Sequence, residues 1–156
     1  MPNVRTFFKY WLPLLAWLAV IFTASSDTKS FEHSSRILAP LLRWLFPQIS
    51  DDTAHLIVLT ARKCAHLIEY AVLALLLWRT LRKPAKNDPR PWNWREARLM
   101  LLLVAFCAAS DEFHQRFVAT RTAHVTDVFI DTAGGAAGLL VLWLIDRWRR
   151  HRRILP

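Results

Sequence analysis

Apolar runs alternate with short charged segments along the whole chain, and the longer runs have the length of membrane-crossing helices. The first predicted crossing, 7–25, contains the apolar run 10–24, which Arg5 and Lys9 precede. The last, 125–146, is followed by a strongly basic tail at 147–156. Because a helix needs about 20 mostly apolar residues to cross a bilayer, both segments are expected to span the membrane.

Two further crossings are predicted between these segments. The range 53–82 contains no Pro or Gly and would form one helix of about 45 Å, whose first half stands outside the bilayer or lines a cavity. The apolar part of 97–115 is short, only Leu99–Ala109. We still predict a crossing there, because otherwise the five Arg of the tail would lie outside, against the positive-inside rule.

A shorter apolar segment, 36–46, lies between the first two crossings and carries Arg36 and Arg43. It is too short to cross, so an interfacial helix or a re-entrant turn is expected, with Trp44 at headgroup level. The predicted fold class is therefore all-α, a small polytopic membrane protein with four transmembrane helices and one interfacial or re-entrant segment. At 156 residues the chain forms a single integral membrane domain.

Basic residues follow the same pattern and set the predicted orientation. The formal net charge is +9, and 14 of the 21 Lys and Arg lie before the first run, within 79–98 or in the tail. These segments flank apolar runs, so the loop 83–96 and both termini are predicted to be cytoplasmic. A nucleic-acid partner is not expected, because the chain has no recognition motif.

The first run has a second interpretation, because it also resembles a signal peptide. It has a basic start, an apolar centre and small residues after it. Polar residues after the run, such as Ser26 and Asp27, match the charged ends of the other predicted helices. This similarity favours a helix that is retained.

The polar residues of the predicted helices fall at one depth. Residues 110–131 alone hold four acids, two His and two Arg, and ionisable groups inside a membrane are usually functional. Counting about 1.5 Å per residue from each cytoplasmic charge puts polar residues of all four helices in the outer half of a hydrocarbon core about 30 Å thick. This depth predicts a polar cavity that opens to the extracytoplasmic side and has an apolar floor.

The predicted cavity residues come from all four helices and from the turn between the last two. They are Asp27, Lys63, His66, Glu69, Tyr70, Ser110, Asp111, Glu112, His114, Gln115, Arg121, Asp127 and Asp131. Asp127 and Asp131 are one helical turn apart and share a face with Gly134. Gly134 and Gly138 form a GxxxG pair, which is typical of close packing on another helix, either in the same chain or in a homo-oligomer.

Together these motifs resemble the VanZ-like family of bacterial membrane proteins, over about residues 20–145. The motifs are SSDTK (25–29), KxxHxxEY (63–70), SDExHQxF (110–117), Arg121 and DxxxDTxG (127–134). The chain departs from the family pattern at Ala119 and Thr120, where a Pro-Gly turn is expected, and at His124, where a small residue is usual. The resemblance implies a bacterial inner-membrane location and a cell-envelope role, since the family is associated with low-level resistance to teicoplanin. It names no reaction.

Binding of a polar headgroup is the first function that these residues allow. Lys63, Arg121 and further Arg62 and Arg116 would pair with phosphate or carboxylate, while the acids and His66 would meet amines or hydroxyls. The apolar floor would hold an acyl or polyprenyl chain or a lipoglycopeptide tail. The partner would then be the lipid bilayer together with an envelope lipid, a lipid-linked precursor or a lipoglycopeptide.

Catalysis and a purely structural role are the alternatives. The set that could bind a divalent metal, zinc or manganese, with a metal-bound water as nucleophile, is His66, Glu69, Asp111, His114, His124 and Asp127. The same set without His124 could act as acid–base catalysts without metal. The absence of an HExxH motif and the nearby Lys and Arg disfavour a bound cation. In the structural alternative the charges pair with one another, for example Lys63 with Glu69.

Overall fold

The computed structural model describes residues 4–26, 30–83, 90–117 and 124–154. The N-terminal helix is continuous over three segments, which are α1 (Val4–Thr6), the π-helical η1 (Phe7–Trp11) and α2 (Leu12–Ser26). The other helices are α3 (Ser30–Leu45), α4 (Asp51–Arg82), α5 (Trp94–Gln115) and α6 (Val125–Ile154). The described residues contain no strand, so the predicted all-α fold class is confirmed for this part of the chain.

Three helical stretches of the described chain are long and apolar enough to cross a membrane. They are Val4–Ser25, Asp51–Arg82 and Val125–Arg152. The chain therefore has the character of a membrane protein, as predicted. α5 is not among the three, because charged residues near both of its ends, such as Glu96 and Asp111, interrupt its apolar run. A fourth crossing through α5 stays a prediction.

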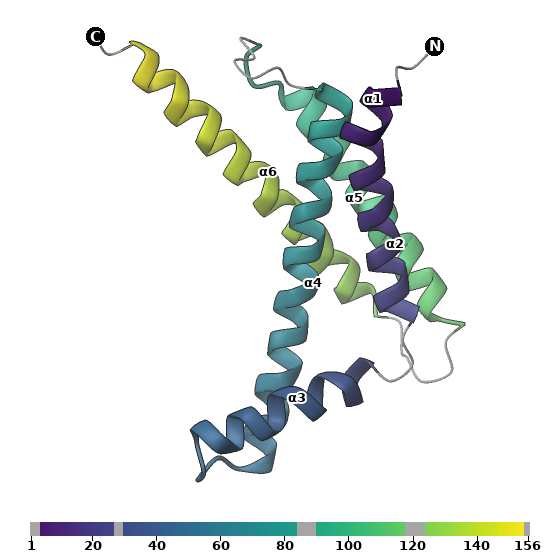
Figure 1. Cartoon of the computed structure of the whole chain (residues 1–156), viewed down its shortest axis with the longest axis vertical. Coiled ribbons are helices and arrows are strands. Elements are labelled where there is room, and N and C mark those ends of the chain that lie inside the picture. Colours follow the sequence, from purple (N-terminus) through teal and green to yellow (C-terminus); the bar gives the residue numbers. More distant parts are fainter. Residues whose placement is uncertain (1–3, 27–29, 84–89, 118–123, 155–156) are drawn as a thin grey trace.

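The helices form a bundle with two distinct ends (Figure 1). α2, α5 and the second half of α4 run alongside one another, and α6 crosses α4 near its middle. The beginning of the chain, the end of α4, the start of α5 and the end of α6 lie at one end, called here the termini end (top in Figure 1). The end of α5 and the start of α6 lie at the other, distal end, and α3 lies across the first half of α4 beyond it.

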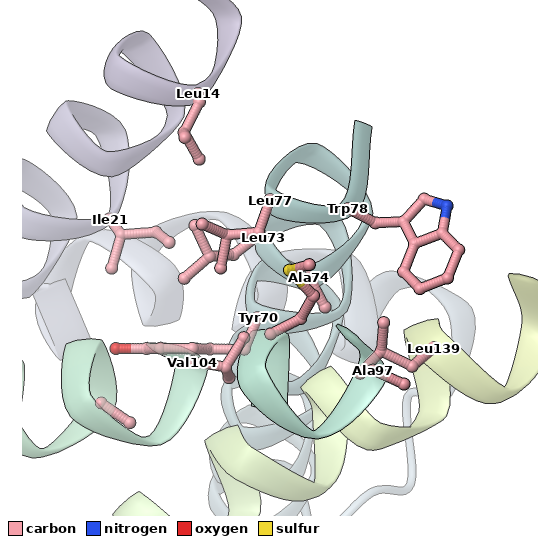
Figure 2. Close-up of a cluster of buried hydrophobic side chains, with 12 residues drawn as sticks. Leu14, Ile21, Tyr70, Leu73, Ala74, Leu77, Trp78, Ala97, Val104 and Leu139 are labelled. Atoms are coloured by element: carbon pink, nitrogen blue, oxygen red, sulfur yellow. The ribbon is translucent and has the colours of Figure 1, made fainter. Parts of the chain in front are cut away.

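The core of the bundle follows one stripe of α4. Tyr70, Leu73, Ala74 and Leu77 are buried at the spacing of one helix face (Figure 2). They form one cluster with Leu14 and Ile21 of α2, Ala97, Met100, Val104 and Ala108 of α5, and Leu139 of α6. α4 is therefore the central helix, and the other three are positioned by their contacts with it and with each other.

The crossing of α4 and α6 depends on glycines. A Cβ atom on Gly138 would lie 2.7 Å from the carbonyl oxygen of Ala71, and one on Gly134 would lie even closer to that of Leu67. Both contacts are with backbone atoms, which cannot move aside as a side chain would. The GxxxG pair thus packs on α4 of the same chain, and this glycine face is already covered without a second copy.

α6 is longer than predicted and includes most of the basic tail. The sequence pattern ended the helix at 146, whereas α6 continues to Ile154. Arg150 Nε lies 2.8 Å from Asp146 Oδ2 one turn earlier, and the guanidinium of Arg152 lies 4.0 Å from the ring centroid of Trp148. Contacts between residues four apart stabilise the helical form, which explains the extension.

Two other helices begin earlier than predicted. α3 starts at Ser30 rather than at 36, and α5 starts at Trp94, inside the predicted loop 83–96. Asn93 explains the second difference, because its side-chain oxygen accepts a hydrogen bond from the backbone N–H of Arg95 at 2.9 Å. Such an N-cap satisfies a donor that has no partner within the helix.

Candidate functional site

Buried polar side chains gather between the core and the distal end of the bundle. We name this group the Asp111 cluster; it consists of Ser25, Tyr70, Asp111, Glu112, Gln115 and Asp131. Asp111 and Asp131 are only 1% and 3% exposed, and Tyr70 is completely buried. The members come from α2, α4, α5 and α6, so every helix of the bundle contributes to the site.

The end of α5 presents two different faces to its neighbours. Asp111 and Gln115 are one turn apart, and the Gln115 Nε2 donates to Asp111 Oδ2 at 3.0 Å and to Ser25 Oγ on α2 at 2.7 Å. Glu112 faces the start of α6, where its Oε2 accepts a hydrogen bond from the backbone N–H of His124 at 3.0 Å. The helical periodicity of α5 thus connects α2 on one side with α6 on the other.

Two oxygens of the cluster have no hydrogen-bond partner among the described residues. They are the hydroxyl of Tyr70 and Oδ1 of Asp111, and both atoms are buried. Leaving a buried polar group unsatisfied costs about 1–3 kcal/mol, so native proteins rarely keep one without a use for it. A ligand with hydrogen-bond donors would satisfy both oxygens.

Several carboxyl groups lie close together in the cluster. Asp131 interacts electrostatically with Asp111, Glu112, Asp127 and Glu69, so carboxyl groups of three helices lie within one another's field. Within the described parts of the chain, no Lys or Arg forms an ion pair with Asp111, Glu112 or Asp131. Within the described residues these three carboxyl groups are thus not neutralised by an ion pair, while Arg121, a candidate partner in the structural alternative, lies outside them.

The carboxyl groups and histidines do not assemble as metal ligands. Across the four described ranges, no group of three or more His, Cys, Asp or Glu side chains is arranged to hold a metal ion. His66 pairs with Glu69 on its own helix, with Nδ1 and Oε2 3.6 Å apart, and His114 is exposed at the end of α5. The predicted His and carboxylate set is thus divided between separate places, and it does not form a coordination site for zinc or manganese.

A pocket lies beside the cluster, between α5 and α6. Its volume is about 320 Å³. The polar residues that line it are Glu112, Arg116 and His124, and its apolar wall includes Phe113, Val125 and Val128. Glu112 therefore belongs both to the Asp111 cluster and to this pocket, which we name the α5–α6 pocket.

The other predicted cavity residues lie around the cluster or outside the described chain. Lys63 is exposed on α4, Asp127 is half-buried, and the hydroxyl of Ser110 donates to the carbonyl of Phe106 at 2.8 Å instead of facing the cluster. Asp27 and Arg121 lie outside the described residues. The structure thus brings together Tyr70, Asp111, Glu112, Gln115 and Asp131 of the predicted set, with Glu69 and Asp127 within electrostatic range.

Sequence reasoning missed two contributions to the site. Ser25 was noted only as part of the SSDTK motif, yet its hydroxyl is 2% exposed and accepts the hydrogen bond from Gln115. Trp17 was not singled out at all, although its indole N–H donates to the backbone oxygen of Glu69 at 2.9 Å and so ties α2 to α4 beside the cluster. A small polar residue after an apolar run was the only local signal for Ser25.

Comparison with known proteins gives one match. A family model described as VanZ/LLP1 matches residues 10–146, a range that contains the whole Asp111 cluster and the α5–α6 pocket. Neither the curated proteins nor the solved structures gave a match to the chain.

Proposed function

Because the chain belongs to the VanZ/LLP1 family, we propose that it is a multi-pass inner-membrane protein that binds the polar part of a cell-envelope amphiphile at the Asp111 cluster. The ligand would be an envelope lipid, a lipid-linked precursor or a lipoglycopeptide. Binding would contribute to envelope homeostasis or to resistance against glycopeptide antibiotics.

One observation carries the proposal. The Tyr70 hydroxyl and Asp111 Oδ1 are buried without hydrogen-bond partners, next to Asp131, whose carboxyl group has no basic partner among the described residues. Desolvated acceptors of this kind favour a ligand that brings N–H or O–H donors. Exposed apolar side chains at the end of α5, such as Phe113, would contact the hydrocarbon part of an amphiphile.

The proposed topology puts this site on the extracytoplasmic side. α5 would be the fourth crossing, and 22 residues at about 1.5 Å each give it roughly the thickness of the hydrocarbon core. Both termini and the connection between α4 and α5 would be cytoplasmic, consistent with their basic residues. α3 would lie at the outer interface, where Trp44, 75% exposed, would sit among the headgroups.

Cysteine labelling tests this topology. In a Cys64→Ser, Cys107→Ala background, a membrane-impermeant maleimide should label Asp52→Cys in intact cells and should label Lys83→Cys only after permeabilisation. Asp52 lies in the first turn of α4 beyond the distal end, and Lys83 follows the last residue of α4 at the termini end. The opposite pattern, or equal labelling of both positions, would reject the proposed orientation.

Native mass spectrometry of the full chain in mild detergent tests ligand binding. The wild type should retain an amphiphile from the membrane, and Asp111→Asn and Asp131→Asn should each lower its occupancy roughly tenfold, the effect of losing one charge-assisted hydrogen bond. Asp146→Asn is the matched control, because Asp146 pairs with Arg150 away from the cluster. A wild-type spectrum without ligand, or equal occupancy in all four proteins, would overturn the proposed function.

A further inference from the structure

We propose that the α5–α6 pocket binds a phospholipid headgroup with a primary ammonium and a phosphate, the phosphoethanolamine type. The ammonium would contact Glu112, and the phosphate would contact Arg116. This inference rests on the proposed function, and it narrows the ligand from envelope amphiphiles in general to a zwitterionic membrane lipid.

The acidic side of the pocket calls for a cation with hydrogen-bond donors. Glu112 is only 7% exposed, and among the described residues it accepts one hydrogen bond, from the backbone of His124. Its carboxyl group also lies in the field of Asp127 and Asp111, which adds negative charge behind it. A primary ammonium carries three N–H donors and a full positive charge. It would therefore donate hydrogen bonds to the Glu112 carboxyl group and offset the repulsion between that group and the neighbouring carboxyl groups.

The basic side of the same pocket calls for an anion. Arg116 follows the last residue of α5 and lines the pocket together with Glu112. Its guanidinium forms no hydrogen bond or ion pair with the described residues, although acidic groups are close in sequence. A guanidinium binds phosphate through two parallel N–H bonds, which makes it the natural partner for the phosphate of a headgroup.

The size of the pocket separates the possible ligands. A volume of about 320 Å³ is at the lower end of the range of about 300–1,000 Å³ for small-molecule sites. It suits a headgroup of a few atoms, whereas the polar part of a glycopeptide or of a saccharide precursor would need a larger space. The pocket therefore favours a simple phospholipid among the ligands that the proposed function allows.

The walls of the pocket indicate a lipid rather than a soluble zwitterion. Phe113 and Val125 line it and are 60% and 66% exposed, and Phe129 next to them on α6 is also largely exposed. Exposed apolar side chains at the mouth of a pocket would contact acyl chains in a membrane. A free phosphoethanolamine molecule gains nothing from such a surface, whereas a lipid buries its glycerol and acyl region there.

Other common headgroups fit this arrangement less well. A quaternary ammonium, as in phosphatidylcholine, has the charge but no N–H to donate to Glu112. A phosphatidylglycerol headgroup has a phosphate for Arg116 but no cation to meet the carboxyl groups. Selectivity for the primary amine is therefore the property that distinguishes this proposal from general lipid binding.

The test uses native mass spectrometry of the full chain, delipidated and then offered phosphatidylethanolamine, phosphatidylcholine and phosphatidylglycerol with identical acyl chains. We expect roughly tenfold higher occupancy by phosphatidylethanolamine, as one additional charge-assisted hydrogen bond would produce. Arg116→Gln and Glu112→Gln should each remove most of this preference, and Arg116→Lys should restore part of it. Arg95→Gln, an exposed arginine at the other end of α5, is the matched control.

Equal occupancy by the three lipids, or an unchanged preference in folded Arg116→Gln, would overturn this inference. Displacement of the lipid by soluble phosphoethanolamine at equal concentration would overturn the lipid as the source of the headgroup. The proposed function fails separately, because it requires only that the wild type retains some amphiphile and that Asp111→Asn loses it.

Discussion

The two ends of the bundle bury charge in opposite ways. At the termini end, the Arg82 side chain is 6% exposed, and it donates to the carbonyl oxygens of Arg90 and Pro91 at 2.9 and 2.7 Å. Its guanidinium also pairs with Glu96 at 3.5 Å and lies over the ring of Trp78. In the Asp111 cluster, by contrast, three buried carboxyl groups have no basic partner among the described residues.

This contrast separates a structural charge from a functional one. Removing one member of a compensated buried pair is strongly destabilising, so the compensated charge of Arg82 stabilises the fold. Carboxyl groups that approach one another without a basic partner, as Asp111 and Asp131 do among the described residues, cost stability and are retained at sites that bind or react. The difference supports a ligand site at the distal side and a helix clamp at the termini end.

The largest expected effect comes from breaking the termini end. Arg82→Ala should lower the free energy of unfolding by about 3–5 kcal/mol, mainly because two carbonyl oxygens lose a charged donor; the loss of the ion pair with Glu96, whose side chain is 40% exposed, adds less. Thermal unfolding in detergent measures the change, with the loss of the monodisperse size-exclusion peak as the readout. Arg95→Ala, which changes an exposed arginine in the first turn of α5, should alter stability by less than about 0.5 kcal/mol.

The next effect comes from moving α6 away from α4. Gly134→Ala should cost about 1–3 kcal/mol in the same assay, because the new methyl group collides with the backbone oxygen of Leu67. It should also lower ligand occupancy, since Asp131 lies one turn before the crossing. Ala137→Val adds volume at an exposed position of α6 and serves as the control. Equal stability of the two variants would contradict the close crossing.

A change of opposite sign is expected at the distal side. In ligand-free protein, Asp131→Asn should raise the free energy of unfolding by about 1–2 kcal/mol, because it removes one of several carboxyl groups that repel one another. Asp146→Asn should instead lower it slightly, because Asp146 pairs with Arg150. If Asp131→Asn destabilises the ligand-free protein, Asp131 has a compensating partner and the contrast between the two ends is wrong.

The smallest effect should come from the unpartnered hydroxyl. Tyr70→Phe removes a buried group without a hydrogen bond, so ligand-free protein should gain about 0.5–1 kcal/mol while ligand occupancy falls. Tyr10→Phe is the matched control, because Tyr10 lies at the termini end beside Lys9 and Arg79. Unchanged occupancy in Tyr70→Phe would exclude the hydroxyl from the binding site.

Much of the helical architecture could be read from the order of residues. The apolar runs within 7–25, 53–82 and 125–146 each correspond to a helix that is apolar enough to cross a membrane. The prediction succeeds because nearly every residue of such a run must be apolar to be buried in lipid. The pattern that identifies the helix therefore lies within the segment itself. The end of α6 was missed, because pairs such as Asp146 with Arg150 keep a charged segment helical without an apolar pattern.

The site could be located but not assembled in this way. Counting helical turns put Asp111 and Asp131 near one depth, and the structure brings both together with Tyr70. The same count also included Lys63 and His114, which are exposed, because depth along a helix says nothing about which face a residue occupies. Faces are set by packing, here by the close approach of α6 to α4 at Gly134.

Composition and periodicity therefore settle that this chain is helical, that it has membrane-crossing segments and that its charge gathers near their ends. They do not distinguish Arg82 from Asp111, since both are charged residues beside an apolar run. That distinction depends on the partners of each residue. Arg82 donates to carbonyl oxygens beyond its own helix. Asp111 accepts from the Gln115 amide, which also donates to Ser25, 90 residues away along the chain. Apolar burial is a property of each segment, whereas compensation of charge is a property of pairs that meet only after folding.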